Sequence, residues 1–233
     1  MDFIIYYGFG LIGLVIVLLA QFNINKNYKK YKKIDLNQNI TGQEVARKIL
    51  DANGLNDIYV VSVQGDLSDH YDPSRKVVRL STDIFNGETI AAASVAAHEC
   101  GHAIQDKEGY FFMRLRSSLV PFVNLVSYLG YFGLFISMIA GITGYLKISI
   151  LILFATILFQ LVTLPVEFDA SKRAKKELEK LGLVDSSELD GCDKMLFSAA
   201  LTYVASLLST LLQLLRLLLI LGRRDDWWSF SCK

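Results

Sequence analysis

The chain has 233 residues and a net charge of +1, and 52% of its residues are hydrophobic. Its mean hydropathy of +0.36 is too high for an ordinary soluble domain and indicates segments that cross a membrane, while the balanced charge gives no reason to expect a nucleic-acid partner. The three cysteines are odd in number and none has C-x-x-C spacing, so neither a disulfide framework nor a cysteine-based zinc site is indicated.

The first expected element is a membrane-spanning helix, because Phe3 to Phe22 is an apolar run of about 20 residues. It lacks the basic start and the small-residue cleavage site of a signal peptide, so we do not expect it to be removed. Five lysines follow between Lys26 and Lys33. Because cytoplasmic flanks of spans are enriched in lysine and arginine, this side is expected in the cytoplasm and the N-terminus outside.

A small mixed domain is expected next. Thr41 and Glu44 have the spacing of a capping box and predict a helix that runs to about Ala52. The expected extended segments are Ile58 to Val63, Leu67 to Tyr71 and Lys76 to Ser81, the last two on either side of the turn Asp72 to Arg75. They predict a hairpin or meander beside the helix that follows, and an exposed edge strand there suits the binding of an extended peptide.

That following helix is expected to start at Asn86 to Glu88 and to end near Gly109, and it contains the motif HExxH. His98 and His102 are four residues apart, so they lie about 40° apart around the helix and one turn along it, close enough to share one Zn²⁺. Glu99 points about 100° away, where its carboxylate can take a proton from water at the metal without becoming a ligand.

The alternative is a buried helix whose two histidines only pack, since motif matches need supporting context. Here the context favours zinc, because the segment reads as one continuous helix. Its small residues around the motif, which would let a neighbouring element approach, are Ala96, Ala97, Gly101 and Ala103.

The second half of the chain predicts further helices. Two apolar stretches, Leu119 to Gly141 and Ile148 to Leu164, are expected as an antiparallel pair of spans joined by the short connection Ile142 to Lys147. A charged helix from Lys172 to Leu181, closed by Gly182, should follow on the cytoplasmic side. The last apolar segment, Leu196 to Leu221, ends in two arginines. A basic outer end contradicts the charge rule, so this segment is expected at the membrane interface or against the catalytic domain.

The expected organisation is residues 1–23, an N-terminal transmembrane helix; 24–118, a cytoplasmic catalytic region with the HExxH helix; 119–164, a transmembrane helical pair; 165–195, a helix with the third ligand and a linker; and 196–233, a C-terminal hydrophobic helix and tail.

A third zinc ligand must come from elsewhere, because a hydrolytic zinc site uses three protein ligands plus water. No third histidine follows His102, so the donor is a carboxylate or His70. Glu167 is the best candidate: it lies where a span re-enters the cytoplasm, two residues after Pro165, which suits the first turn of a helix that can cross over the HExxH helix. The alternative is a Glu in a first helical turn, favoured there only by the helix dipole.

Four segments resemble a known family: DHYDPSRKVVRLS, AAHECGHAIQD, LPVEFDAS and ALTYVASLLSTLLQLLRLLL. They resemble the neutral zinc metallopeptidases of the YugP-like group, which are multi-pass bacterial membrane proteins, and the match covers nearly the whole chain. More distantly the chain is similar to HtpX-like and CAAX-prenyl-type membrane peptidases. Their third ligand is a Glu on a later helix, which supports Glu167. Those relatives carry Asp four residues after that Glu, where this chain has Ser171, so the orienting carboxylate is missing or supplied elsewhere, by Asp169, Asp72 or Asp83.

His70 has two possible roles. It could donate a hydrogen bond to the oxyanion of a tetrahedral intermediate, as histidine or tyrosine does in many zinc peptidases, or it could cap the hairpin turn. The structural role is favoured, because the sequence does not fix its distance from the metal.

The sequence therefore predicts a mainly α integral membrane protein whose transmembrane helices accompany a small α+β zincin-like domain with an HExxH helix. Its expected function is that of a zinc endopeptidase of the gluzincin type in the bacterial cell membrane. The catalytic site faces the cytoplasm close to the bilayer, and the substrates are membrane proteins or peptides. The competing class is a non-catalytic zinc-binding membrane scaffold, against which Glu99 argues because a structural site does not need it. A transporter is disfavoured, because the chemical residues cluster on one helix and not along the spans.

Overall fold

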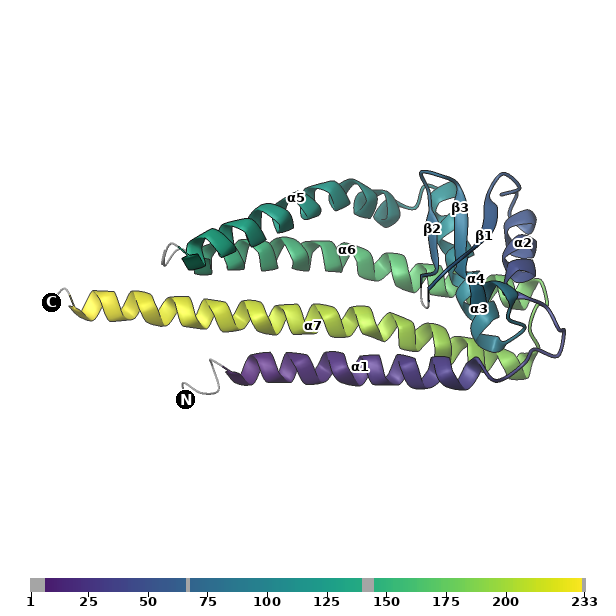
Figure 1. The fold of residues 1–233 in the computed structure, drawn as a ribbon, viewed down its shortest axis with the longest axis horizontal. Helices are drawn as coiled ribbons and strands as arrows, with labels where there is room; N and C mark the ends of the chain where they lie inside the picture. The colour runs from purple at the N-terminus through teal and green to yellow at the C-terminus, as the bar shows by residue number, and fades with distance from the viewer. Residues whose placement is uncertain (1–6, 66–67, 140–144, 232–233) are drawn as a thin grey trace. The chain divides into compact units, whose positions relative to one another are not determined.

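The computed structural model describes residues 7–65, 68–139 and 145–231. The helices and strands in chain order are α1 (Phe9–Tyr31), α2 (Gly42–Ala52), β1 (Tyr59–Val63), β2 (His70–Asp72), β3 (Val77–Ser81), α3 (Thr82–Asn86), α4 (Ile90–Lys107), α5 (Phe111–Ile139), α6 (Tyr145–Lys180) and α7 (Ser186–Ser231) (Figure 1). The protein is thus mainly helical with one small sheet, as predicted. The chain divides into two compact units. We call residues 1–20, 115–163 and 202–233 the apolar unit, and residues 21–114 and 164–201 the mixed unit.

The apolar unit consists of long helical segments. Among the described residues, three helices are long and apolar enough to cross a membrane: Phe9–Tyr31, Leu146–Lys180 and Ser186–Gly222. Large apolar side chains such as Leu19, Leu151 and Leu218 are exposed on them, which is typical of a surface that faces lipid. Parts of four predicted segments lie outside the described residues: the start of the first span at residues 3–6, the first residue of the extended segment at 67–71, the end of the span predicted over 119–141, and half of the connection at 142–147.

The helix boundaries in the second half differ from the prediction. Pro165 was expected in a first helical turn, and the charged segment from Lys172 was expected as a separate helix, but both lie inside the single helix α6. An interior proline removes one backbone hydrogen bond. The helix continues because the face that follows the proline is buried. That face consists of Val166, Ala170, Ala174 and Leu178, which follow the helical period. The segment at 196–221 likewise belongs to one continuous helix, α7.

The mixed unit contains a three-stranded sheet in the order β1-β3-β2. Strands β2 and β3 form the predicted antiparallel hairpin, with His70 opposite Arg79. The turn between them is held by Asp72, whose carboxylate accepts hydrogen bonds from the backbone N–H groups of Ser74 and Arg75. Strand β1 pairs with β3 in parallel, with Tyr59 opposite Val77. Within the part of the chain that the structure describes, both β1 and β2 are therefore edge strands of this sheet.

Helix α2 covers one side of α4 and begins with the predicted capping box. The Thr41 hydroxyl accepts from the Glu44 backbone N–H at 3.3 Å, and the Glu44 carboxylate accepts from the Thr41 backbone N–H at 2.9 Å. The buried residues of α2 that face the core are Val45, Ala46, Ile49 and Leu50. They belong to the same core as the alanines of α4, so α4 is fixed on this side by apolar packing.

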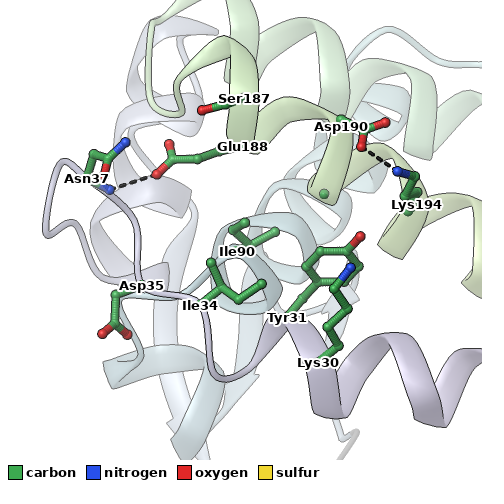
Figure 2. A pocket seen from close by; sticks show the side chains of 11 residues that line it. Lys30, Tyr31, Ile34, Asp35, Asn37, Ile90, Ser187, Glu188, Asp190 and Lys194 are labelled. Atoms are coloured by element: carbon green, nitrogen blue, oxygen red, sulfur yellow. Dashed lines mark hydrogen bonds and ion pairs between the residues drawn. The ribbon is translucent and has the colours of Figure 1, made fainter.

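The start of α4 is fixed beside a cavity of about 370 Å³ (Figure 2). The cavity is lined by the end of α1, the loop after it, Ile90 of α4 and the first turns of α7. Three of its charged side chains make hydrogen bonds or ion pairs with neighbouring groups. Glu188 accepts from the backbone N–H groups of Asn37 and Asp185 at 2.8 and 2.7 Å, and Lys194 pairs with Asp190. The Ile90 backbone N–H donates to Ile34 at 3.0 Å. The lining therefore joins α1, α4 and α7 within the mixed unit.

Candidate metal centre

Helix α4 carries the HExxH motif and has the predicted extent. Thr89 caps its start by accepting a hydrogen bond from the Ala92 backbone N–H at 3.2 Å. After its end at Lys107, the chain turns away at Gly109, whose φ of +63° is the left-handed conformation that glycine adopts without strain. The small residues of the motif do let a neighbour approach: the backbone of α6 passes directly over Gly101. Helices α4 and α6 therefore meet at the motif.

This contact brings together His98, His102 and Glu167, the three residues expected as metal ligands. Their ligand atoms all lie within 4.8 Å of one another. Oε2 of Glu167 lies 3.3 Å from Nε2 of His98 and 3.7 Å from Nε2 of His102. Two ligand atoms at zinc bond lengths in tetrahedral geometry lie about 3.4 Å apart. The cluster therefore has the donor types and the spacing of a zinc site.

The orientation of the two rings also suits a shared ion. Each ring turns its Nδ1 away from Glu167 and contacts a neutral polar side chain through it. Nδ1 of His98 lies 3.2 Å from the Ser171 hydroxyl, and Nδ1 of His102 lies 3.0 Å from Oε1 of Gln105. These contacts leave both Nε2 atoms facing the carboxylate, as outer hydrogen bonds do for metal-binding histidines.

Gln105 is fully buried and extends this arrangement to α6. Its Nε2 donates to the backbone carbonyl of Val166 and to the carboxylate of Asp169, both at 2.8 Å. Asp169 also accepts from Arg173, whose guanidinium pairs with Glu108 at 2.6 Å. Asp169, one of the three carboxylates expected to orient a ligand, thus reaches His102 only through the Gln105 amide.

The other two expected carboxylates are engaged elsewhere. Asp72 pairs with Arg79 at 2.9 Å. Hydrogen bonds from Ser74 and Arg79 hold the pKa of its carboxyl well below the usual range, despite the opposing effect of burial. Asp83 forms an ion pair with Lys32, which precedes it by 51 residues in the chain. For His98 the contact comes from Ser171.

Glu99 is buried and does not belong to the ligand cluster. Its Oε2 accepts a hydrogen bond of 2.9 Å from the backbone N–H of Tyr71 in the edge strand β2. A second carboxylate lies near enough to sense its charge. Burial raises the pKa of Asp69, and the negative charge of Glu99 adds to that rise, while hydrogen bonds from Ser81 offset part of it. The HExxH carboxylate thus stands beside a sheet edge, within the same unit as the ligands.

His70 contacts its own hairpin. Its Nδ1 lies 2.8 Å from the Ser68 carbonyl oxygen, and its Nε2 lies 3.2 Å from Nη1 of Arg79. Both ring nitrogens thus contact groups near the start of β2 and on β3, and neither contact is to the turn at 72–75. Both roles of His70, as a cap of the turn and as a catalytic donor, stay predictions.

Sequence reasoning missed the contribution of Gln105 and undervalued Ser171. A signal for each was present. Gln105 follows His102 by three residues, which places it beside that ligand on one face of α4, and Ser171 follows Glu167 by four, which places it on the face of α6 that carries Glu167.

Comparisons with known proteins agree with this site. A family model described as "Putative neutral zinc metallopeptidase" matches residues 6–222. The chain is also 45% identical over 208 residues to "Putative membrane protease YugP" of Bacillus subtilis (strain 168). The aligned region covers 89% of this chain and 92% of that protein. No solved structure matches the chain. On the extent of these matches, this chain belongs to the neutral zinc metallopeptidase family.

Proposed function

We propose that this protein is a membrane-bound zinc endopeptidase whose catalytic site faces the cytoplasm. The observation that carries the proposal is the meeting of His98, His102 and Glu167 across 69 residues of sequence, with Glu99 next to the first histidine but outside the cluster. Three ligands and an adjacent carboxylate that is not a ligand make up the residue set of a hydrolytic zinc site.

The three clustered residues would hold the metal, and their geometry fits it. Zn²⁺ bound there would supply a Lewis acid that polarises a peptide carbonyl and makes water a better nucleophile. The two histidines would bind through Nε2, because their Nδ1 atoms contact Ser171 and Gln105. Glu167 would supply the single negative charge of the ligand set.

Glu99 is the proposed general base. The Tyr71 backbone N–H donates to its Oε2, and among the described residues no donor bonds its Oε1. That oxygen can accept a proton from the attacking water as the water oxygen bonds to the carbonyl carbon. When the C–N bond breaks, Glu99 returns the proton to the leaving nitrogen, which yields a carboxylic acid and an amine. The scaffold alternative gives Glu99 no such task.

The proposed substrates are membrane proteins or peptides bound in extended form. Support comes from β2, an edge strand of the sheet whose central residue, Tyr71, contacts Glu99. A peptide that pairs with a sheet edge is held by its backbone, so a segment beside β2 would bring a peptide bond near Glu99.

The cytoplasmic orientation is supported by charge. The lysine-rich segments at 26–33 and 172–180 both belong to the mixed unit, which also contains the ligand cluster. Lysines flank spans on the cytoplasmic side, so the cluster is expected there too.

The proposal is tested with the full chain purified in detergent. We expect about one zinc per chain by elemental analysis, and cleavage of an unfolded, casein-like protein within its chain. A chelator should abolish cleavage and added Zn²⁺ should restore it. Zinc-loaded protein that cleaves no peptide from a broad library of membrane-protein segments would instead support the scaffold.

A further inference from the structure

We infer that Gln105 is a positioning residue that joins the two halves of the ligand cluster, orienting His102 on α4 and holding α6 at the residue that precedes Glu167. The inference rests on the proposed metal site but not on peptidase activity. The side-chain amide of Gln105 has one acceptor oxygen and one donor nitrogen with two N–H groups. The oxygen contacts His102, and the nitrogen donates to Val166 and Asp169.

The first part of the role concerns the tautomer of His102. The Gln105 Nε2 group donates to Val166 and Asp169, so its Oε1 is the atom that faces Nδ1 of His102 at 3.0 Å. A carbonyl oxygen can only accept, and therefore Nδ1 of His102 carries the proton. The lone pair then resides on Nε2, the atom that faces Glu167. Gln105 thereby selects the tautomer that can bind a metal.

The second part concerns the position of α6. Glu167 is the only ligand on α6, and its backbone is placed by its neighbour Val166. The carbonyl of Val166 accepts from Gln105 at 2.8 Å. Because Gln105 lies three residues after His102 on α4, this bond fixes the distance between the histidine pair and the carboxylate. Full burial of Gln105 means that no water replaces the bond when it is lost.

Only an amide at position 105 can both orient the His102 ring and hold α6 at Val166. A carboxylate of the same shape can still accept from His102, but it has no N–H to donate to Val166. It would also face the carboxylate of Asp169 at hydrogen-bonding distance, and like charges at that distance repel. An apolar side chain of similar size loses every bond. The two substitutions therefore separate orientation of the ring from attachment of the helix.

The test uses full-length protein with Gln105→Leu and Gln105→Glu. The matched control is Gln160→Leu, because Gln160 is also a helical glutamine with a side-chain hydrogen bond, to Ser206, but has no contact with a ligand residue. Zinc affinity is measured by competition with a chelator. The histidine rings are followed by ¹⁵N NMR, with and without zinc, and the chain has only three histidines.

We expect Gln105→Leu to weaken zinc binding about 10- to 100-fold and to abolish the hydrogen-bonded Nδ1–H signal of His102. Gln105→Glu should keep that signal and still weaken zinc binding, while Gln160→Leu should match the wild type. Wild-type zinc affinity in both Gln105 variants, or an unchanged His102 signal in Gln105→Leu, would overturn the inference. If Gln105→Leu does not fold, the zinc affinity of Gln105→Glu tests the inference: weaker binding than in the wild type supports it, and wild-type affinity overturns it. Wild-type protein that binds zinc without cleaving peptides would refute the proposed function and leave this test intact.

Discussion

Gly101 and Ala170 lie in direct backbone contact between α4 and α6: a Cβ built on Gly101 would stand 2.5 Å from the Ala170 carbonyl oxygen. No carbon atom is tolerated at that distance from a backbone oxygen. Glu167 is three residues before Ala170 on the same helix, and His98 and His102 flank Gly101 on the other. The absence of a side chain at position 101 therefore allows the carboxylate to reach both histidines.

Gly101→Ala should accordingly separate the ligands. The helices must move apart to admit the methyl group, which we expect to destabilise the fold by about 1–3 kcal/mol and to lower zinc affinity. Chemical unfolding and chelator competition measure the two effects. The control is Gly222→Ala, since a Cβ at Gly222 meets nothing within 4 Å. Wild-type zinc affinity in Gly101→Ala would show that the helix contact does not set the ligand spacing.

The identity of the third ligand makes a separate prediction. Glu167→Ala should lose zinc, because two histidines alone do not hold it firmly. Asp169→Ala and His70→Ala should keep one zinc per chain, since Asp169 contacts the amide of Gln105 and His70 contacts Ser68 and Arg79.

Metal content of the three purified variants decides between them. Stoichiometric zinc in Glu167→Ala, or loss of zinc in His70→Ala alone, would mean that another group completes the site.

The local parts of this site could be read from the sequence. The capping box of Thr41, the extent of α4 and the hairpin around Asp72 depend on residues close together in the chain. Glu167 was also predicted, because zinc chemistry requires a third donor, because this residue lies where a span ends near Pro165, and because the resembling peptidases carry a Glu on a later helix.

The parts that could not be read depend on contacts between distant segments. The proline rule favours a helix start at Pro165, yet the helix continues because burial of Val166 and Ala170 outweighs one lost hydrogen bond. The parallel pairing of β1 with β3 leaves no signal in either strand alone. Gln105 follows the motif, but its partners on α6 are about 60 residues away in the chain, and only the packed structure brings them together.

Zinc binding should weaken in acid. Burial lowers the pKa of His102, but the hydrogen bond to Glu167 and the charges of Glu99 and Glu167 raise it by more, so the pKa in the metal-free protein lies above the usual histidine value. A proton on the ring competes with the metal. As the pH falls through this raised pKa, the apparent zinc affinity should fall by about tenfold per unit.

The raised pKa of His102 has the opposite effect on the stability of the metal-free protein, which it increases at low pH. A raised folded pKa contributes stability that is fully present below the unfolded pKa and lost as the pH rises through the folded one. The gain in Tm on adding zinc should therefore grow from pH 5.5 to pH 8. A gain that is constant over this range would contradict protonation of the site.

The proposed orientation predicts which side of the membrane is labelled. Cysteines placed at Lys33 and Lys175, both on lysine-rich segments, should resist a membrane-impermeant thiol reagent in intact cells and react after permeabilisation. Cys100 and Cys192 are buried, so the background needs only Cys232→Ser. Ready labelling of either introduced cysteine in intact cells would place the site on the outer face.

The most direct measurement is zinc content and peptide cleavage in Glu99→Gln. Gln keeps the size of the side chain and can still accept from the Tyr71 backbone N–H, but it does not take a proton from water, and no ligand is removed. The account predicts one zinc per chain, wild-type unfolding behaviour and loss of hydrolysis by several orders of magnitude. Turnover close to that of the wild type would contradict the peptidase mechanism, and loss of zinc would show that Glu99 holds the metal.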